Sequence, residues 1–475
     1  MKQKILFFFL LSGLCLMAQG QIKNSPDNVV ITSKKNKTQV RANQNGELRI
    51  NVSPKDIQKF KADGLVRYSN FGASGDGKTD DTDAIAGAHA YANQQGLPVK
   101  ADEGATYYIG GKDRTAVIQT DTDFGTAAFI IDDTDVENRN APVFMVSSSL
   151  EAFKPMGISS LERDRKKLDV SLPGTCLITV TNSNVKRYIR YGPNQNNGSS
   201  QTDIFIVDNN GNVDMDAPII WDFDQITEIT ALPVDEKTLT ITGGRFTTIA
   251  NQAESKYTYY SRGIAIRRSN VLVDGLEHRV TGEKDHGAPY GGFINVPFVN
   301  CSQTNDINDR TYWGIMGSNF CKNLVLDNCT FSRFDAHMGV ANATIRNSTL
   351  GHMGINAIGT GIFTVENSTI MGRTLINLRS DSGSTWQGEF IIRNCTFIPG
   401  GGRPVSASLI GGSNSGQHDF GYTCYMPERI IIEDLYIDDS NHPADYKGPA
   451  IFGNFNPKMT DDSYNEKFLY VKTRE

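Results

Sequence analysis

The chain lacks the features that mark several large classes of protein. It has no long run of Lys or Arg and its formal net charge is −6, so its overall field does not attract a polyanion, and nucleic acid is not an expected partner. Beyond residue 20, no stretch approaches the roughly 18 apolar residues that a membrane-spanning helix needs. Cysteine is scarce, with seven in 475 residues. These absences favour a soluble protein whose function lies in a local site.

The first twenty residues differ from the rest. Two lysines precede an apolar run over residues 5–17, which ends at the small-residue sequence 18–20. This pattern predicts a secretory signal peptide at 1–20, because the run is too short to span a bilayer stably. A lipoprotein anchored at Cys15 is the alternative, but Leu14 stands where such signals need a small residue. We expect a secreted protein, or one of the periplasm or cell envelope.

The remaining chain is predicted to be one long β-rich domain with a short extension before it. The extension, residues 21–67, is polar, with a strand candidate at 48–52 and a helix candidate near 56–60. Over residues 68–475, short alternating segments are separated by Gly, Asn, Pro and Asp turns, as is typical of strands. The sequence leaves open whether about 150–240 forms a β-rich insertion. Because solenoids grow by adding coils, one continuous core can carry this length.

A glycine- and aspartate-rich block opens the main domain. Residues 70–83 read NFGASGDGKTDDTD, which predicts a turn whose aspartates supply N-cap oxygens and first-turn negative charge to a following helix. We expect that helix over 81–95, with Ile85, Ala88 and Ala92 on one face and Gly96 at its C-terminal cap. A phosphate or metal site in the same loop is the alternative.

This block resembles the N-terminal signature of the pectate-lyase superfamily, in which Phe-Gly-Ala, Asp-Gly and Thr-Asp-Asp-Thr sequences lead into a helix. The resemblance covers about residues 68–437. It implies an all-β fold, a right-handed parallel β-helix (solenoid), with an N-terminal capping helix. Such a helix would hide backbone groups at the edge of the solenoid that otherwise template aggregation.

The C-terminal half carries an irregular repeat in which β-branched residues precede an Asx residue. The spacings between these Asx residues are 26, 28, 19, 20, 27 and 40. Asn tolerates the left-handed backbone of a turn, and its amide can bond to the coils above and below, so the repeat predicts an asparagine ladder in a β-helix. The predicted ladder consists of Asp274, Asn300, Asn328, Asn347, Asn367, Asn394 and Asp434.

Three cysteines share the position after a ladder residue. Cys301, Cys329 and Cys395 are therefore expected to stack inside the solenoid as small apolar fillers rather than to form disulfides. We expect free, buried thiols even though an exported protein could pair its cysteines.

One face of a sheet is predicted to carry polar residues that can bind a substrate or act on it. Residues at equal offsets after the ladder should stack at about 4.8 Å per coil. The ninth residue after the ladder Asn is His337 in one coil and Asn356 in the next, and the tenth in the coil after that is Asn377. Arg333, Asp335 and His337 should share the outward face of one strand. A solvated solenoid surface is also polar, which is the alternative for each of them.

Two longer segments are expected to lie over this face. The stretch 281–313 concentrates charged and aromatic residues, and 381–386 lengthens its coil into a loop that ends at Trp386, suited to stacking on a sugar ring. A tryptophan in such a loop can instead cover the edge of the solenoid.

These patterns lead to specific candidates. The predicted catalytic residues are His337, Asp335, His352, Arg379 and Tyr312. The predicted substrate-binding residues are Arg310, Trp313, Arg333, Asn356, Arg373, Asn377, Trp386, His286 and Tyr290. Asp381 is the candidate metal ligand.

The candidate set matches the demands of β-elimination at a uronic acid. The proton on C5 of the uronate is lost to a base once the neighbouring carboxylate is neutralised by Ca²⁺, Arg or a hydrogen-bond donor. Segments 333–337 and 381–386 look like those of exported Bacteroidetes-type proteins that include chondroitin-sulphate lyases. We therefore expect a monomeric lyase acting on an acidic polysaccharide, with Ca²⁺ as the candidate cofactor.

Two other functions stay open. A glycoside hydrolase needs two carboxyl groups, which Asp335 with Asp309 or Asp381 could supply. The polygalacturonases of this fold carry a Gly-His-Gly motif, and the nearest match is the sequence 351–354, GHMG, without the rest of the family pattern. The second alternative is a non-catalytic carbohydrate-binding or adhesion solenoid.

Overall fold

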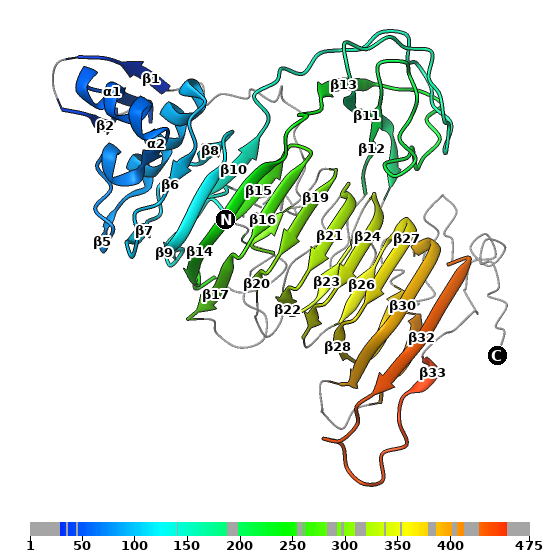
Figure 1. The fold of residues 1–475 in the computed structure, drawn as a ribbon. Helices are drawn as coiled ribbons and strands as arrows, with labels where there is room; N and C mark the ends of the chain where they lie inside the picture. Colours follow the sequence, from blue (N-terminus) through cyan, green and yellow to red (C-terminus); the bar gives the residue numbers. More distant parts are fainter. Residues whose placement is uncertain are drawn as a thin grey trace, which may run out of the picture.

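The computed structural model describes residues 29–34, 37–43, 46–139, 141–187, 198–253, 260, 262–282, 292–295, 299–308, 320–336, 339–351, 354–378, 386–400, 406–412 and 427–453. The predicted signal peptide lies outside these residues. Within them the chain is mostly β-structure arranged as a parallel β-helix, as the sequence predicts (Figure 1). No helix in the described residues is both long enough and apolar enough to cross a membrane.

The predicted extension folds into a small sheet and a helix. The strands β1 (Val29–Thr32), β2 (Gln39–Ala42) and β3 (Leu48–Asn51) form a sheet with β3 in the middle. Helix α1 (Pro54–Asp63) begins after Ser53, whose hydroxyl accepts a hydrogen bond from the Asp56 amide at 3.1 Å. It ends at Gly64, where φ is +66°. The predicted strand at 48–52 and helix near 56–60 are confirmed.

The glycine- and aspartate-rich block leads into helix α2 (Thr82–Gln95), which matches the prediction of 81–95. Gly96 ends the helix in the left-handed conformation, also as predicted. The Asp81 carboxylate does not cap the helix but accepts hydrogen bonds from the amides of Ser74 and Gly75. Asp80 instead accepts from the Thr82 amide at 3.0 Å. The aspartates thus stabilise the turn itself, while the capping of the solenoid by α2 stays a prediction.

The walls of the solenoid are built from parallel strands of successive coils. Two walls belong to one continuous set of paired strands. These strands are β4 (Val66–Arg67), β5 (Asp76–Asp80), β6 (Val99–Lys100), β7 (Thr106–Ile109), β9 (Thr122–Asp132), β14 (Leu239–Ile249), β16 (Val271–Asp274), β17 (Glu277–Thr281), β19 (Cys301–Thr304), β20 (Ile307–Asn308), β21 (Lys322–Asp327), β22 (Thr330–Phe331), β24 (Val340–Arg346), β25 (Thr349–Leu350), β27 (Gly359–Glu366), β28 (Thr369–Gly372), β30 (Trp386–Pro399) and β32 (Arg429–Ile437).

The remaining wall is described in two parallel sheets. The first, in spatial order, contains β8 (Ala116–Ile118), β10 (Phe144–Ser147), β15 (Ile264–Arg267) and β18 (Ile294–Asn295). The second contains β23 (Phe334–Asp335), β26 (Ile355–Ala357), β29 (Thr374–Leu378), β31 (Ser408–Gly412) and β33 (Ala450–Gly453). We call this second sheet the site sheet, because Asp335, Asn356 and Asn377 lie on it.

The asparagine ladder exists, but two predicted members, Asp274 and Asn300, do not lie in its column, since Asp274 pairs in register with Thr304 and not with Asn305. Asn328 donates to the Asn305 side chain at 2.6 Å, and Asn394 donates to the Asn367 side chain at 2.7 Å. These residues have φ between 47° and 57°, the left-handed region that Asn tolerates. The ladder residue of the second predicted coil is Asn305, so placing Asn300 there was wrong.

Asn300 belongs to a second ladder at another turn of the coil. It accepts a hydrogen bond from the Asn323 side chain at 3.0 Å, and Asn270, Asn323 and Asn342 have positive φ like it. A β-branched residue precedes an Asn at both turns of this coil, Val299 before Asn300 and Thr304 before Asn305. The pattern therefore indicates a turn but does not say which one.

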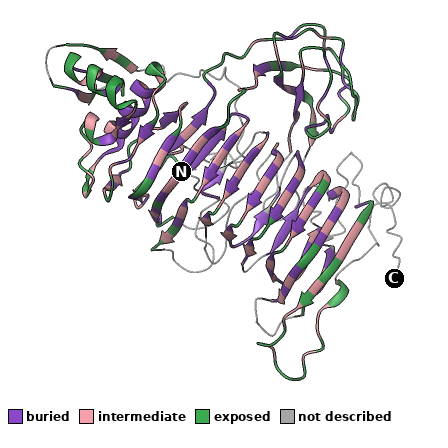
Figure 2. Ribbon diagram, viewed as in Figure 1, coloured by how far each residue is buried: buried purple, intermediate pink, exposed green. Residues whose placement is uncertain are grey.

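Buried residues recur along the strands of the solenoid (Figure 2), and the apolar ones among them form one core. Phe129 and Phe246 stack with ring centroids 4.6 Å apart. Cys301, Cys329 and Cys395 are at most 3% exposed and free, as predicted. Cys176 and Cys321 are also free and buried, so the thiols in the described part of the chain pack as small apolar groups.

The stretch 281–313 is not a simple insertion. Its described part contains β18, β19 and β20, which pair in register with β15, β16 and β17 of the preceding coil. Residues 292–295 and 299–308 therefore belong to a regular coil of the solenoid. The prediction of one long loop over this stretch was wrong for these residues, because their alternation of buried and exposed positions is that of strands.

An antiparallel sheet stands beside the solenoid (Figure 1). Its strands are β11 (Cys176–Arg187), β12 (Ser199–Val207) and β13 (Glu228–Pro233), with β11 in the middle. It has its own apolar core, which includes Phe205 and Phe223. This sheet lies within the stretch 150–240 for which the sequence left an insertion open. Figure 1 shows it close to the ends of β24 and β27.

Candidate functional site

The site sheet brings polar residues of three successive coils into one row. Asp335 on β23 pairs with Asn356 on β26, and Asn356 pairs with Asn377 on β29. Adjacent strands lie about 4.8 Å apart, so the row repeats at that spacing along the solenoid axis. The same register continues to Gly411 on β31 and to Gly453 on β33. The row thus carries one acidic residue, two amides and then two residues without side chains.

The two amides of the row bond to each other. The Asn377 side-chain amide donates a hydrogen bond to the Asn356 side-chain oxygen. The neighbours of Asn356 on its strand, Ile355 and Ala357, are fully buried in the solenoid core. Because side chains alternate along a strand, Asn356 points away from that core, yet it is only 6% exposed. The arrangement orients the amides firmly, and it also serves as a short ladder that stabilises the sheet.

The register corrects one geometric prediction. Counting from the ladder placed His337 in the same row as Asn356, whereas the residue paired with Asn356 is Asp335. The count failed because the turns between the ladder and the site sheet differ in length from coil to coil. His337 itself lies outside the described residues, so its role stays a prediction.

The two described arginine candidates differ in exposure. Arg373, which precedes β29, is exposed, as a cation that receives a substrate anion must be. Arg333 is only 5% exposed, so the prediction that it faces solvent was wrong. Its backbone lies between β22 and β23, next to the fully buried Ser332 and Phe334. Whether it contacts substrate stays a prediction.

Trp386 is not a sugar-stacking residue at a loop tip. Its side chain is fully buried, and its indole N–H donates to the Gly361 carbonyl at 2.9 Å. It packs edge-on against Phe363, with ring centroids 5.1 Å apart, and it lies at the start of β30. The prediction of a substrate contact was therefore wrong. The sequence position was ambiguous, because the residue that ends a loop also begins the next strand, where its side chain can point into the core.

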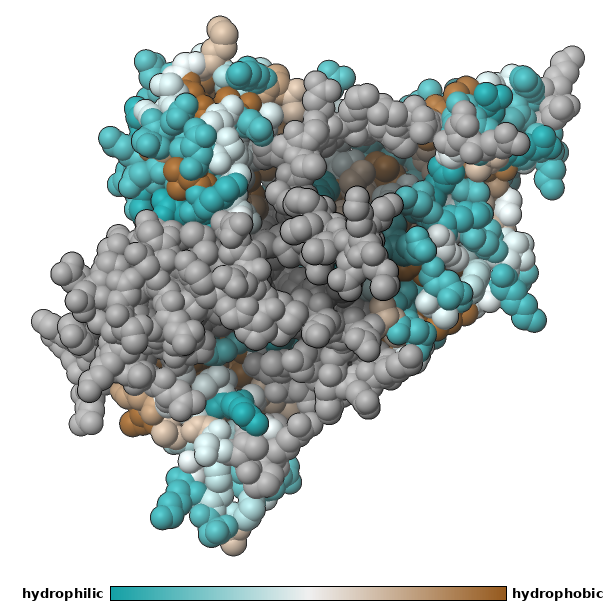
Figure 3. Space-filling model, turned by 180° about the vertical axis from the view of Figure 1, so that it is seen from behind, coloured by the Kyte–Doolittle hydropathy of each residue, from teal (hydrophilic) through white to brown (hydrophobic). Residues whose placement is uncertain are grey.

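Most of the predicted site residues lie outside the part of the chain that the structure describes. The candidates outside the described residues are His286, Tyr290, Arg310, Tyr312, Trp313, His337, His352, Arg379 and Asp381. In the described part of the chain, no group of three or more His, Cys, Asp or Glu residues could hold a metal ion. The rear view in Figure 3 shows mainly hydrophilic surface among the described residues.

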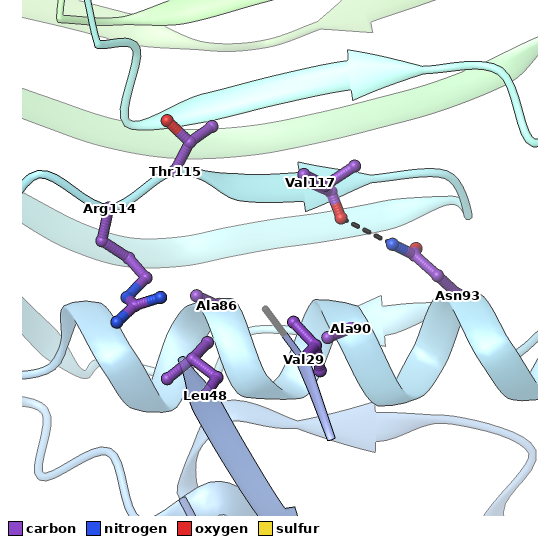
Figure 4. Close-up of a pocket in the computed structure, with 8 residues that line it drawn as sticks. All are labelled: Val29, Leu48, Ala86, Ala90, Asn93, Arg114, Thr115 and Val117. Atoms are coloured by element: carbon purple, nitrogen blue, oxygen red, sulfur yellow. Dashed lines mark hydrogen bonds between the residues drawn. The ribbon is translucent and has the colours of Figure 1, made fainter. Parts of the chain in front are cut away.

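A small cavity near the N-terminal end is not a substrate site. It measures about 30 Å³ and lies between α2, β8 and the strands β1 and β3 (Figure 4). Its polar residues already have partners, since Asn93 donates to the Val117 carbonyl and Arg114 to the Asp83 carboxylate. The cavity has room for about one water molecule and none for a sugar ring.

Sequence reasoning missed two polar features. Lys322 and Asp203 form a fully buried ion pair at 2.9 Å between the solenoid and the antiparallel sheet. No local pattern marks such a pair across 119 residues. The other feature is a set of buried polar residues at 303, 306 and 308. An alignment of adjacent coils would have found it, because the corresponding residues of those coils are mostly apolar.

Comparison with known proteins gives likeness of fold only. No protein-family model matches the chain, and no curated protein matches it. Among solved structures, it is similar to the Gp54 tailspike of Acinetobacter baumannii bacteriophage AP22, in complex with A. baumannii capsular saccharide, at 11% identity and a TM-score of 0.41, over 87% of this chain and 72% of that chain.

Two further similar structures have different functions in their names. One is a hyperthermoactive exopolygalacturonase from Thermotoga maritima, at 11% identity and a TM-score of 0.34, covering 81% of this chain and 96% of that one. The other is the surface protein and adhesin PfbA of Streptococcus pneumoniae, at 10% identity and a TM-score of 0.29, covering 82% and 100%. Likenesses of this size do not distinguish an enzyme from an adhesin.

Proposed function

We propose that this chain is an exported polysaccharide lyase that cleaves a uronic-acid-containing polymer by β-elimination. The observation that carries the proposal is the row of Asp335, Asn356 and Asn377, held in register on a rigid sheet. Rigid strands hold a binding constellation more precisely than loops do. The resemblance of residues 70–83 to the pectate-lyase superfamily signature supports the same function.

The proposed mechanism assigns one task to each residue. His337 takes the proton from C5 of the uronate, and Asp335, two residues earlier, orients its imidazole. Arg379 and Asn356 bond to the uronate carboxylate and stabilise the charge that develops there. The electron pair of the broken C–H bond forms the C4–C5 double bond and expels the glycosidic oxygen. Tyr312 or water protonates that leaving oxygen.

Ca²⁺ could supply the same neutralisation of the carboxylate. The described residues contain no cluster of acidic, His or Cys ligands for it, and the candidate ligand Asp381 lies outside them. Activity that is lost in chelator and recovered with Ca²⁺ would add the ion to the site, whereas indifference to chelator would leave the role to Arg379 and Asn356.

The test exploits the product of elimination. Purified mature protein is offered pectic, alginate and glycosaminoglycan polymers, each with and without Ca²⁺. We expect the ultraviolet absorbance of a C4–C5 unsaturated uronate on at least one polymer, with chondroitin-type chains first. New reducing ends without that absorbance would support the hydrolase instead. Absence of product on every polymer, together with binding to one of them, would support a non-catalytic solenoid.

His337→Ala separates chemistry from folding. We expect this variant to lose turnover while its melting temperature stays close to that of the wild type, because the sequence predicts that His337 points outward, and such a residue buries little apolar area. A large drop in melting temperature would show that His337 is structural. The exposed Arg279 on β17 offers a control, since Arg279→Ala should change neither quantity.

A further inference from the structure

One coil of the solenoid has a polar interior. Its inward positions are Gln303, Asp306 and Asn308, on β19, the following turn and β20, and each is at most 2% exposed. In the preceding coil the paired positions hold Val273, Leu276 and His278. In the following coil they hold Leu326, Cys329 and Phe331. Apart from His278, whose imidazole bonds to the Thr248 hydroxyl, the paired positions of the two flanking coils are apolar.

These side chains lack hydrogen-bond partners in the described part of the chain. Both amide atoms of Gln303, both amide atoms of Asn308 and the Oδ2 atom of Asp306 are buried and unpaired. Only Asp306 Oδ1 has a partner, the Leu276 amide at 3.0 Å. Buried polar groups in native proteins are almost always bonded, so a set of unpaired atoms in one layer indicates a bound species.

The chemistry of the unpaired atoms identifies that species. They include amide N–H donors as well as carbonyl and carboxyl oxygens. A cation would satisfy the oxygens and leave the N–H groups unpaired, whereas water both donates and accepts. The side chain of Asn308 is also smaller than those of His278 and Phe331, which flank it in the same column.

We propose that this coil encloses a cluster of ordered water molecules bound by Gln303, Asp306 and Asn308. A buried water makes about three hydrogen bonds, so five unpaired atoms call for about two waters. The cluster lies at the end of β20, where the chain enters the segment that contains Arg310, Tyr312 and Trp313. The proposal is independent of the lyase activity.

A crystal structure of the mature protein at a resolution that shows solvent tests the proposal directly. The expected result is density for water within hydrogen-bond distance of all three side chains. Density with oxygen ligands at about 2.3–2.6 Å, lost after dialysis against chelator, would overturn it in favour of a cation. An empty layer, or side chains turned to protein partners, would overturn it as well.

A second measurement does not depend on crystals. Oxygen-17 relaxation dispersion counts waters that exchange slowly from the interior. We expect the triple variant Gln303→Leu, Asp306→Cys, Asn308→Phe, which copies the following coil, to hold about two fewer such waters than the wild type. An unchanged count in a folded variant would contradict the proposal. If this variant fails to fold, the crystal structure of the wild type decides.

Discussion

The Asp306 carboxyl is buried inside the solenoid and accepts a hydrogen bond from the Leu276 amide. It interacts electrostatically with Asp274 and Cys329, neither of which can carry a positive charge. Burial, with a smaller contribution from the charge of Asp274, raises the pKa of Asp306 well above its ordinary value. The group is therefore expected to be a neutral acid over part of the acidic range, able to donate a hydrogen bond through Oδ2.

The raised pKa predicts how stability depends on pH. The folded state holds the proton of Asp306 more tightly than the unfolded chain, where the pKa is about 3.9. This contribution to stability is full below about pH 4 and is lost as the pH rises through the folded pKa. We expect Asp306→Asn, which cannot ionise, to be more stable than the wild type at pH 7 and to lose that advantage near pH 4.

Urea unfolding at several pH values measures this difference. Asp327→Asn is the matched control, because hydrogen bonds from Asn347 and Arg346 lower the pKa of Asp327. Its contribution has the opposite sign, being present above the unfolded pKa and lost as the pH falls. If the difference in free energy of unfolding between Asp306→Asn and the wild type were the same at pH 4 and pH 7, the Asp306 carboxyl would not be the group that titrates.

Arg373 carries the second prediction at the scale of the residue. It is exposed just before β29, the strand that carries Asn377, and an exposed arginine can bind a sulphate or carboxylate by paired hydrogen bonds. If the proposed function holds, Arg373→Ala should raise KM for an anionic polymer by about tenfold, the equivalent of about 1.4 kcal/mol. Arg279→Ala, which removes an equally exposed arginine from β17, should leave KM unchanged. Equal changes in KM for the two variants would show that Arg373 does not bind the polymer.

The antiparallel sheet is attached to the solenoid by a buried ion pair. Lys322 bonds to the Asp203 carboxylate and to the Pro218 carbonyl. Asp203 also accepts a hydrogen bond from the Ile220 amide at 2.8 Å. Burial raises the pKa of Asp203 and lowers that of Lys322, since both charges have left water. Removal of one partner would leave the other buried and uncompensated.

We expect Lys322→Met to lower the free energy of unfolding by about 3–5 kcal/mol. The control is Lys100→Met, which breaks a pair with Asp123 at 2.9 Å whose two side chains are 43% and 39% exposed. An exposed pair contributes about 1 kcal/mol or less, so the control should differ little from the wild type. Similar losses for the two variants, measured by urea unfolding, would show that the attachment does not depend on the buried pair.

The whole molecule is expected to keep its thiols reduced and out of reach. Burial raises the pKa of Cys301 and of Cys329 to about 12, so neither forms the reactive thiolate at neutral pH. To isolate the described thiols, Cys424, which lies outside the described residues, is replaced by Ser. The mature Cys424→Ser protein should show no fast reaction with a thiol reagent when folded. It should show five reactive thiols in denaturant. Fast reaction of the folded protein would mean that the core opens readily.

The sequence by itself determined the features that depend on local backbone chemistry. The recurring Asn residues marked the left-handed turns, a conformation that a residue such as Asn328 adopts at low cost. The Gly and Asp turn with its helix was found to within one residue, because helix capping is local. The free thiols of Cys329 and Cys395 followed from their place beside the ladder, whereas Cys301 follows an Asn of the second ladder.

Only the tertiary structure decided which residues share a row and which side chains are buried. The pairing of Asp335 with Asn356 depends on the length of every turn between them and the ladder, and these lengths vary. Trp386 is buried because the next coil closes over it, and Lys322 meets Asp203 across 119 residues. A local sequence pattern carries no information about contacts between residues so far apart in the chain. The register of the site sheet, on which the proposed chemistry depends, was therefore set by the stacking of whole coils.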